Sequence, residues 1–160
     1  MATYTVDQFR KKLERFARTQ PRIVHNAVKS AAEMVRTEAV TKHLSGPKMA
    51  RGVGSKTNAT LQPDTGGLRS SVHTRVYRSG GRIRGTVGTN KKYAKIHEYG
   101  GTIRPKTAKY LKFKAGGRFY SAQEVTIPER SYLRSSLDKK RRAVLNLMLR
   151  KLIEGYKQSG

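Results

Sequence analysis

Residues 93–103 read YAKIHEYGGTI, a stretch that sets a histidine beside a glutamate and carries two glycines near its end. Ile96 and His97 follow Tyr93 by three and four positions, as residues on one face of a helix do. Gly100 suits the end of such a helix, because glycine readily adopts the left-handed backbone of a C-cap. The stretch therefore predicts a short helix over residues 92–99 that turns the chain into a strand.

The pair His97–Glu98 raises a second interpretation, a hydrolytic metal site. Zinc peptidases of the His-Glu-x-x-His type need two imidazoles one helical turn apart, but Gly101 stands where the second histidine would be. Adjacent helix residues also point about 100° apart and cannot share a ligand. We therefore expect no metal here, and we interpret Glu98 as an exposed side chain or as the partner of a basic neighbour.

Other catalytic motifs are incomplete. Residues 52–57, GVGSKT, partly resemble a phosphate-binding loop, but Ser55 and Ala50 occupy the positions of its glycines. The four histidines lie on separate predicted elements, and a chain with only ten acids is poorly supplied for a paired-carboxylate site. Cysteine is absent, so disulfides and thiolate metal sites cannot contribute. The sequence predicts no enzyme, with no catalytic residue, cofactor or metal.

Alternating residues predict strands before the short helix. Val72, Thr74 and Val76 share one face, residues 79–81 supply a glycine turn, and the alternation resumes at Ile83. The opposite face of this hairpin is basic and collects Arg75, Arg82 and Arg84. One side of the hairpin is therefore expected to be strongly positive.

Strands are also predicted after the short helix. A strand over residues 102–115 would place Leu111 and Phe113 on one face and Lys112 and Lys114 on the other. Gly116–Gly117 would turn the chain, and Val125 and Ile127 mark a final short strand.

Long helices are expected at both ends of the chain. Residues 5–44 begin with a capping-box pattern at Thr5 and Gln8, and Pro21 is expected to break or kink the run. An apolar, Ala-rich face follows, made by Val24, Val28, Ala31, Val35 and Ala39. A second helix is predicted over 128–157, started by Thr126, Pro128 and Glu129. Its apolar arc widens after Val144, which predicts burial on two sides, against the sheet and against the first helix or a neighbouring subunit.

These elements predict a single α+β domain over residues 1–160. An antiparallel sheet of about four strands over 69–127, with the short helix 92–99 within it, would pack against the two long helices. Residues 45–68 lack periodicity and are rich in Gly, Ser, Thr and Pro, so they predict a long loop arm.

The charge is extreme. The chain has 35 Lys and Arg against 10 Asp and Glu, a formal net charge of +25, and no acid lies between Asp64 and Glu98. Such a body repels itself unless something negative is near, so the charge predicts a nucleic acid or an acidic protein surface as neighbour; a merely soluble basic surface is the plainer alternative. The candidate polyanion-binding residues are Arg75, Arg82, Arg84, Lys112 and Lys114.

Charge without a named nucleic-acid motif indicates non-specific contact with phosphates and no sequence reading. Tyrosine outnumbers phenylalanine 8 to 4, and rings with a polar tip suit interfaces. The candidate interface residues are Tyr93, Tyr99, Tyr132, Leu133, Leu152 and Tyr156. The first residues, MATYTVDQFRKK, lack the apolar segment of a signal peptide, and no run approaches the roughly 18 apolar residues of a membrane span. We expect assembly in the cytoplasm and no membrane contact.

Several short motifs follow one another along residues 88–137. The first is a Tyr-Ala pair that leads to Glu-aromatic-Gly-Gly, namely Tyr93, Ala94, Glu98, Tyr99, Gly100 and Gly101. A strand with Pro-Lys and Leu-x-Phe follows, at Ile103, Pro105, Lys106, Leu111 and Phe113. An Ile-Pro-x-Arg entry to the last helix comes next, at Val125, Ile127, Pro128, Arg130, Tyr132 and Leu133. Residues 64–71, DTGGLRSS, precede the first strand.

In this order and spacing the chain resembles the neck and tail-completion proteins of tailed bacteriophages. Ser131 departs from the pattern, because the family often has proline there. The resemblance implies a structural virion protein without catalytic residues, which forms a ring at the head–tail junction or closes the tail before it joins the head. Its implied partners are further copies of itself, portal or adaptor proteins, and tail-terminator or tail-tube proteins.

A ring through which DNA passes would also account for the charge of +25. We therefore expect basic faces that line a DNA channel or contact acidic partners. A free, basic nucleic-acid-binding protein that is not part of a virion is the alternative, and it predicts salt-sensitive DNA or RNA binding by a monomer.

Overall fold

The computed structural model describes residues 6–46, 66–115 and 118–158, without the side chains of Phe9, Lys114 and Ala115. The capping box expected at Thr5 and most of the loop expected over 45–68 lie outside these residues. The chain divides into two compact units. The first takes in residues up to Val35, Thr74–Val87 and residues from Lys140 on, and the second takes in Arg36–His73 and Gly88–Lys139. The single domain over 1–160 stays a prediction.

The helical region predicted over 5–44 is present, and it runs through Pro21 without ending there. Helix α1 runs over Val6–Glu38 and a π-helical turn, Ala39–His43, follows it. Pro21 lies inside α1 and does not end it, so the expected break there is absent. Proline lacks the N–H that would donate to the preceding turn, and burial of the turns after Pro21 compensates for this lost hydrogen bond. The buried residues of these turns are Ala27, Ala31, Ala32 and Val35.

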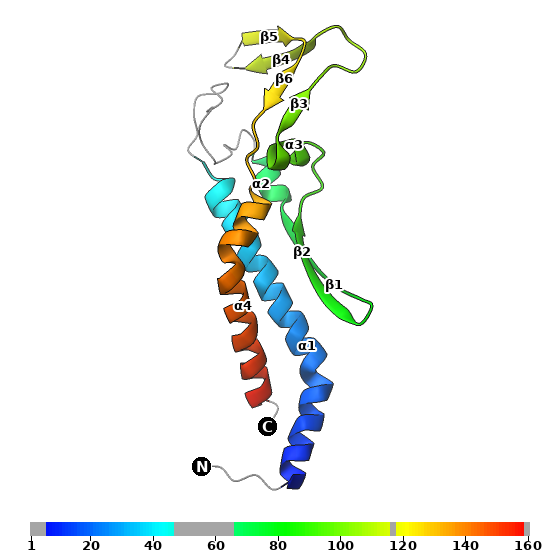
Figure 1. The fold of residues 1–160 in the computed structure, drawn as a ribbon, viewed down its shortest axis with the longest axis vertical. Helices are drawn as coiled ribbons and strands as arrows, with labels where there is room; N and C mark the ends of the chain where they lie inside the picture. Colours follow the sequence, from blue (N-terminus) through cyan, green and yellow to red (C-terminus); the bar gives the residue numbers. More distant parts are fainter. Residues whose placement is uncertain (1–5, 47–65, 116–117, 159–160) are drawn as a thin grey trace. The chain divides into compact units, whose positions relative to one another are not determined.

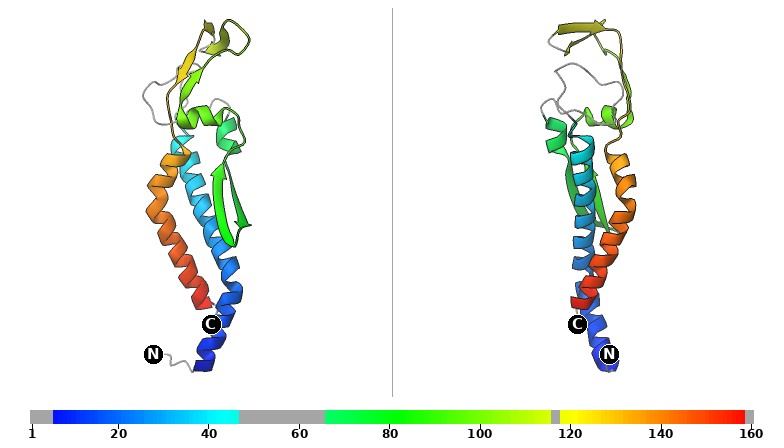
Figure 2. Two further views of the ribbon diagram at one scale, coloured as in Figure 1. Left: turned by 45° about the vertical axis from the view of Figure 1, so that its right-hand side comes forward. Right: turned by 90° about the vertical axis from the view of Figure 1, so that its left-hand side faces the viewer.

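In the first unit, a β-hairpin lies along α1, and α4 lies beside α1 (Figures 1 and 2). Strands β1, His73–Ser79, and β2, Arg82–Gly88, are joined by Gly80 and Gly81, both at positive φ as a tight hairpin turn requires. A Cβ at Gly85 would lie 2.8 Å from Cγ1 of Val28, so this glycine lets β2 approach the helix closely. The predicted hairpin is confirmed.

Helix α4, Leu133–Gln158, packs on α1 through small and aromatic residues. A Cβ at Gly155 would lie 2.7 Å from the Ile23 side chain, which places the two helices in close contact. The rings of Phe16 and Tyr156 meet edge to face at 5.3 Å. The expected packing of the C-terminal helix on the first helix is therefore present within this unit.

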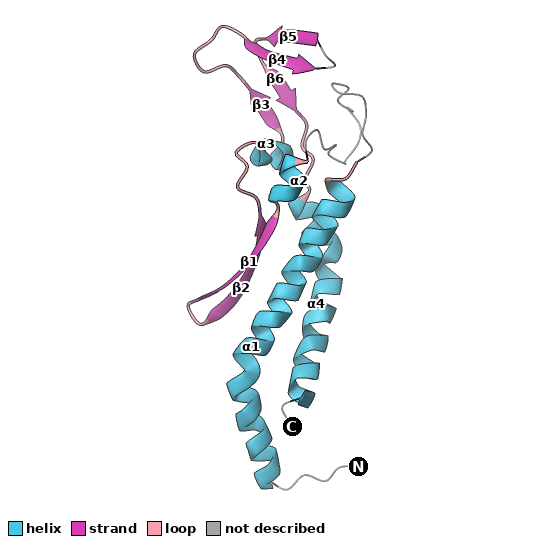
Figure 3. Cartoon of the chain, turned by 180° about the vertical axis from the view of Figure 1, so that it is seen from behind, coloured by secondary structure: helices cyan, strands magenta, loops and turns pink. Residues whose placement is uncertain are grey.

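Besides the π-helical turn and the start of α4, the described residues of the second unit form short helices and short strands (Figure 3). The helices are α2, Gly67–Ser71, and α3, Ala94–Tyr99. Strand β3, Gly101–Ile103, pairs antiparallel with β6, Val125–Ile127. Strand β4, Leu111–Ala115, pairs antiparallel with β5, Arg118–Ala122. The short helix predicted over 92–99 is confirmed with its start two residues later.

The α+β class with antiparallel pairing is confirmed, but the arrangement of strands differs from the prediction. The described strands form three two-stranded sheets, β1–β2, β3–β6 and β4–β5, in place of one sheet of about four strands. The strand expected over 102–115 is interrupted between Ile103 and Leu111. Pro105 lies in that interval and cannot donate to a strand ladder.

The start of the last helix also differs from the prediction. Helix α4 begins at Leu133 and not at residue 128. The residues interpreted as a capping box belong to other contacts: Thr126 lies in β6, where its hydroxyl is 3.1 Å from that of Thr102, and Glu129 pairs with Arg134. The loop expected to reach residue 68 ends earlier, since Gly67 begins α2. No helix of the described residues combines the length and the apolar content of a membrane crossing.

Candidate interaction surfaces

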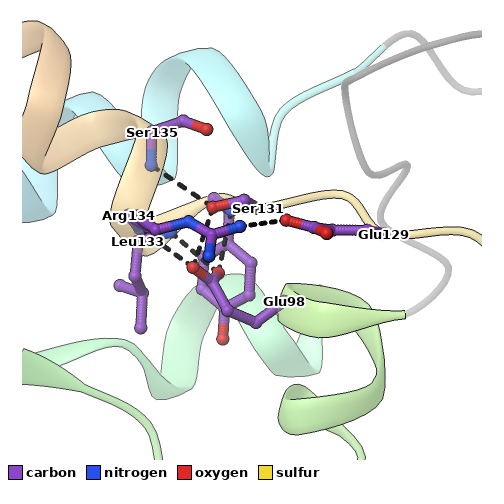
Figure 4. A network of polar contacts seen from close by, with 7 residues as sticks. Glu98, Glu129, Ser131, Leu133, Arg134 and Ser135 are labelled. Atoms are coloured by element: carbon purple, nitrogen blue, oxygen red, sulfur yellow. Dashed lines mark hydrogen bonds and ion pairs between the residues drawn. The ribbon is translucent and has the colours of Figure 1, made fainter. Parts of the chain in front are cut away.

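Glu98, from the stretch quoted at the outset, is a buried acid of the second unit. It lies in α3, is 5% exposed, and faces the start of α4 (Figure 4). Its carboxylate accepts hydrogen bonds from the backbone N–H groups of Tyr132, Leu133 and Arg134, each at 2.9 Å. The Ser131 hydroxyl donates a fourth bond, also at 2.9 Å. Glu98 therefore caps the N-terminus of α4, although it lies far from that helix in the sequence.

This geometry corrects the expectation that Glu98 would be exposed or paired with a basic side chain. The first N–H groups of a helix have no partner within the helix, and its N-terminal end attracts negative charge. A buried carboxylate with two oxygens satisfies three of these donors at once. Ser131, which stands where the resembling family often has proline, adds its hydroxyl to the same cluster and accepts from the N–H of Ser135 at 3.3 Å.

The titration of the cluster follows from these contacts. Burial raises the pKa of Glu98, but the three backbone N–H groups and the Ser131 hydroxyl lower it by more, so the pKa lies below its ordinary value of 4.5. Burial raises the pKa of the Tyr132 phenol to about 12, and the charge of Glu98 adds to the effect. Near neutral pH the carboxylate is ionised and the phenol is protonated.

His97 has no part in this cap. Its backbone carbonyl accepts from the N–H of Arg130 at 2.9 Å, and its ring meets that of Tyr93 edge to face at 6.0 Å. Burial lowers the pKa of His97, and the Arg130 guanidinium lowers it further. Among the described residues no group of three His, Cys, Asp or Glu side chains could hold a metal ion. Both residues therefore join α3 to the chain around the start of α4, His97 through its backbone and Glu98 through its carboxylate.

The basic hairpin β1–β2 presents its arginines to solvent. Arg75, Arg82 and Arg84 are all exposed, while Val76, Ile83 and Val87 on the other face are half-buried. Thr74 donates a hydrogen bond to the carboxylate of Glu33 on α1, which helps to hold the hairpin with its arginines outward. The expected division into an apolar and a basic face is present within the first unit.

The other candidate cations lie in the second unit, on β4. Lys112 is exposed, and the side chain of Lys114 lies outside the described part of the chain. The structure therefore divides the five candidate residues between two units, three on one hairpin and two on another.

The candidate interface residues have very different surroundings. Tyr93 and Tyr99 are 45% and 60% exposed, so both rings are open to contact. Leu133, Leu152 and Tyr156 are half-buried. Tyr132 is 1% exposed and lies in the core beside the Glu98 cap, which leaves it no surface to offer to a partner. Its role is internal packing.

Two apolar surfaces are exposed among the described residues, and the one on α4 overturns an expectation, since the apolar arc of this helix was predicted to be buried on two sides. On α4, Leu145, Leu149 and Ile153 are 55%, 59% and 55% exposed and recur every four residues along one face. On the hairpin β4–β5, Phe113, Phe119 and Tyr120 are 39%, 82% and 48% exposed. The first surface is visible in the sequence as the widened apolar arc after Val144. The second could have been found from Phe119 and Tyr120, the aromatic residues that follow Gly116–Gly117 in the sequence.

One comparison with known proteins gave a match. The family model HK97-gp10_like, described as "Bacteriophage HK97-gp10, putative tail-component", matches residues 7–100, which is more than half of the chain. The matched span runs from the start of α1 through the hairpin β1–β2 to the end of α3. No curated protein and no solved structure matches the chain.

Proposed function

We propose that this chain, which belongs to the HK97-gp10-like family of bacteriophage tail components, acts at the head–tail junction as one subunit of a ring that joins head to tail. The observation that carries the proposal is the family match over residues 7–100. A structural tail component needs no catalytic site, which agrees with the helix-capping role of Glu98.

The exposed apolar face of α4 supports assembly with other subunits. Leu145, Leu149 and Ile153 form a continuous row on the side of the helix that is not packed on α1. Soluble monomers rarely expose contiguous apolar patches, and such patches mark protein contacts. A ring would cover this row by contact between neighbouring copies, because a head-to-tail interface closes into a ring when its rotation allows.

The arginines of the β1–β2 hairpin support contact with a polyanion. Arg75, Arg82 and Arg84 are exposed on one face of a hairpin whose other face packs on α1, and the whole chain has a net charge of +25. Guanidinium groups pair well with phosphate oxygens, and backbone contacts of this kind carry no sequence information. We assign this face to the DNA that passes the junction.

Disruption of the gene in its phage tests the assembly role. We expect infected cells to accumulate filled heads and separate tails, and we expect wild-type protein supplied in trans to restore joined particles. The purified protein should form a ring whose mass is an integer multiple of 18.0 kDa by native mass spectrometry. Normal yields of infectious, joined particles without the protein would refute the proposal.

Charge reversal tests the DNA contact. Arg82→Glu with Arg84→Glu should lower the retention of DNA in particles and weaken DNA binding in vitro by about tenfold or more, with a shallower salt dependence. Lys91→Glu with Lys92→Glu is the matched control, since both lysines are exposed and the charge change is the same. Equal effects of the two double variants would show that only total charge matters.

The charge of +25 also favours the second candidate, a basic nucleic-acid-binding protein that is not part of the virion. That function predicts a monomer that binds DNA or RNA tightly at low salt and is absent from purified particles. Mass spectrometry of virions separates the two functions directly.

A further inference from the structure

The hairpin β4–β5 turns apolar side chains to solvent on both of its faces. The pairing Phe113↔Tyr120 places these two rings on one face, where they stack at 5.9 Å, and Phe119 lies on the other. Phe113, Tyr120 and Phe119 are 39%, 48% and 82% exposed. None of the described side chains of β4 and β5 is buried.

The described residues of the chain give this two-stranded hairpin little packing, since they bury none of its described side chains. Isolated two-stranded sheets are marginally stable in water and need packing on one face. The hairpin β1–β2 has that packing, because Gly85 brings β2 against Val28 of α1. The hairpin β4–β5 keeps its aromatic residues in water, which indicates a surface that another molecule covers.

The charge around the aromatic residues restricts what that molecule is. Residues 101–127 contain six lysines and arginines, and Glu124 is their single acid. Glu124 already accepts a hydrogen bond from Arg104 at 3.0 Å. The exposed cations beside the rings include Lys109, Lys112 and Arg118. Arg118 lies on the face of Phe113 and Tyr120, and Lys112 lies on the face of Phe119, so each face of the hairpin has exposed aromatic side chains bordered by cations, a positive rim.

Three kinds of occupant can be compared with this surface. Duplex DNA offers phosphates to the cations but nothing apolar for the rings, so it would leave the aromatic residues wet. A second copy that brought the same hairpin would place one positive rim against another. A protein surface with apolar residues inside an acidic rim matches both features.

We propose that β4–β5 is a docking arm that packs in the assembled particle against an apolar, acid-rimmed surface of a different virion protein. The aromatic residues supply the contact area, and the lysines and arginines select a partner of opposite charge. This inference rests on the proposed function, since it names the chemistry of a partner within the same particle.

The test uses heads and tails purified separately from phage that lacks this gene. Wild-type protein should co-sediment with one of them, and Phe113→Ser with Tyr120→Ser should weaken that binding at least tenfold. Tyr77→Ser is the matched control, because Tyr77 is 44% exposed on the other hairpin, and it should bind as wild type does. Hydroxyl-radical footprinting should show protection of Phe113 and Tyr120 in the complex, and Lys109→Glu with Lys112→Glu should weaken the same binding.

Each remaining outcome overturns the inference. Binding of the double serine variant at wild-type strength would show that the rings are not in the contact. If the double serine variant no longer forms the oligomeric ring but still binds heads or tails, the hairpin makes contacts between copies of this chain. If the variant loses only DNA binding, the hairpin contacts DNA. If wild-type protein binds neither heads nor tails and is missing from virions, the proposed function itself fails.

Discussion

The Glu98 cap and the β4–β5 hairpin belong to the same unit but differ in burial. At the cap, a buried carboxylate meets four donors from Ser131 to Arg134, and the adjacent Tyr132 is 1% exposed. At the hairpin, paired aromatic rings remain in water. The acceptor and donors of the cap all come from the described residues, whereas these residues leave the rings of the hairpin exposed.

This difference separates the residues that make the fold from those available for assembly. A satisfied buried cluster stabilises one conformation, because any other would leave donors or charge without partners. An exposed aromatic face contributes little to folding and gains its free energy only when a partner covers it. Substitutions in the two regions should therefore have opposite effects on folding and on assembly.

The largest expected effect comes from removing the cap. Glu98→Ala leaves three backbone N–H groups at the start of α4 without their acceptor, so we expect the free energy of unfolding to fall by about 3 kcal/mol. Urea denaturation followed by circular dichroism measures it. Glu129→Ala removes an exposed carboxylate from the same neighbourhood and should cost no more than about 0.5 kcal/mol. Similar costs for the two variants would contradict the role assigned to Glu98.

A smaller loss is expected at the end of α3. Gly100 has φ of 67°, and an added Cβ would lie 2.6 Å from the backbone nitrogen of Glu129. Gly100→Ala should therefore lower the free energy of unfolding by about 2 kcal/mol, from strain and from displacement of the chain that leads to the cap. Gly88→Ala meets no atom within 4 Å and serves as the control. If Gly100→Ala left the free energy of unfolding unchanged, the close contact between the added Cβ and the backbone of Glu129 would have to relax without cost, contrary to the prediction.

Acid should weaken the cap in a defined direction. The pKa of Glu98 is lower in the folded protein than its ordinary value of 4.5, so its ionisation stabilises the fold above that value. The contribution decreases as pH falls below 4.5 and is lost once pH passes the folded pKa. The free energies of unfolding of wild type and Glu98→Gln, measured from denaturation curves, should therefore approach each other as the pH is lowered. A difference that does not change between pH 7 and pH 3 would contradict an ionised cap.

Local patterns predicted much of this fold, and its long-range contacts are where prediction failed. Alternation and the glycine pair identified β1–β2, and the spacing around Tyr93 identified α3. The start of α4 was placed five residues early, because the sequence TIPE fits a capping box as well as a strand end. The true cap comes from Glu98, more than 30 residues away in sequence, and no local signal marks that pairing.

The interaction surfaces were predicted only in part for a related reason. Alternation shows that the two faces of a strand differ, but it does not show which face the chain itself covers. Arg75, Arg82 and Arg84 are exposed as expected because the opposite face packs on α1. The same pattern placed Leu111 and Phe113 on one face of a strand without showing what covers that face, and the structure leaves the Phe113 ring 39% exposed. In the sequence, an apolar face that another protein covers looks the same as an apolar face that packs in the core.

The smallest expected effect on folding belongs to the hairpin and tests the contrast most directly. Phe113→Ser with Tyr120→Ser removes two large rings, a change that costs several kcal/mol in a core. Because these rings are exposed, the free energy of unfolding should change by no more than about 0.5 kcal/mol. Tyr132→Ser, the same chemical change at a ring that is 1% exposed, should cost about 4 kcal/mol. If the double variant unfolds as easily as Tyr132→Ser, the aromatic face serves the fold, and the division between a self-contained cap and an incomplete hairpin is wrong.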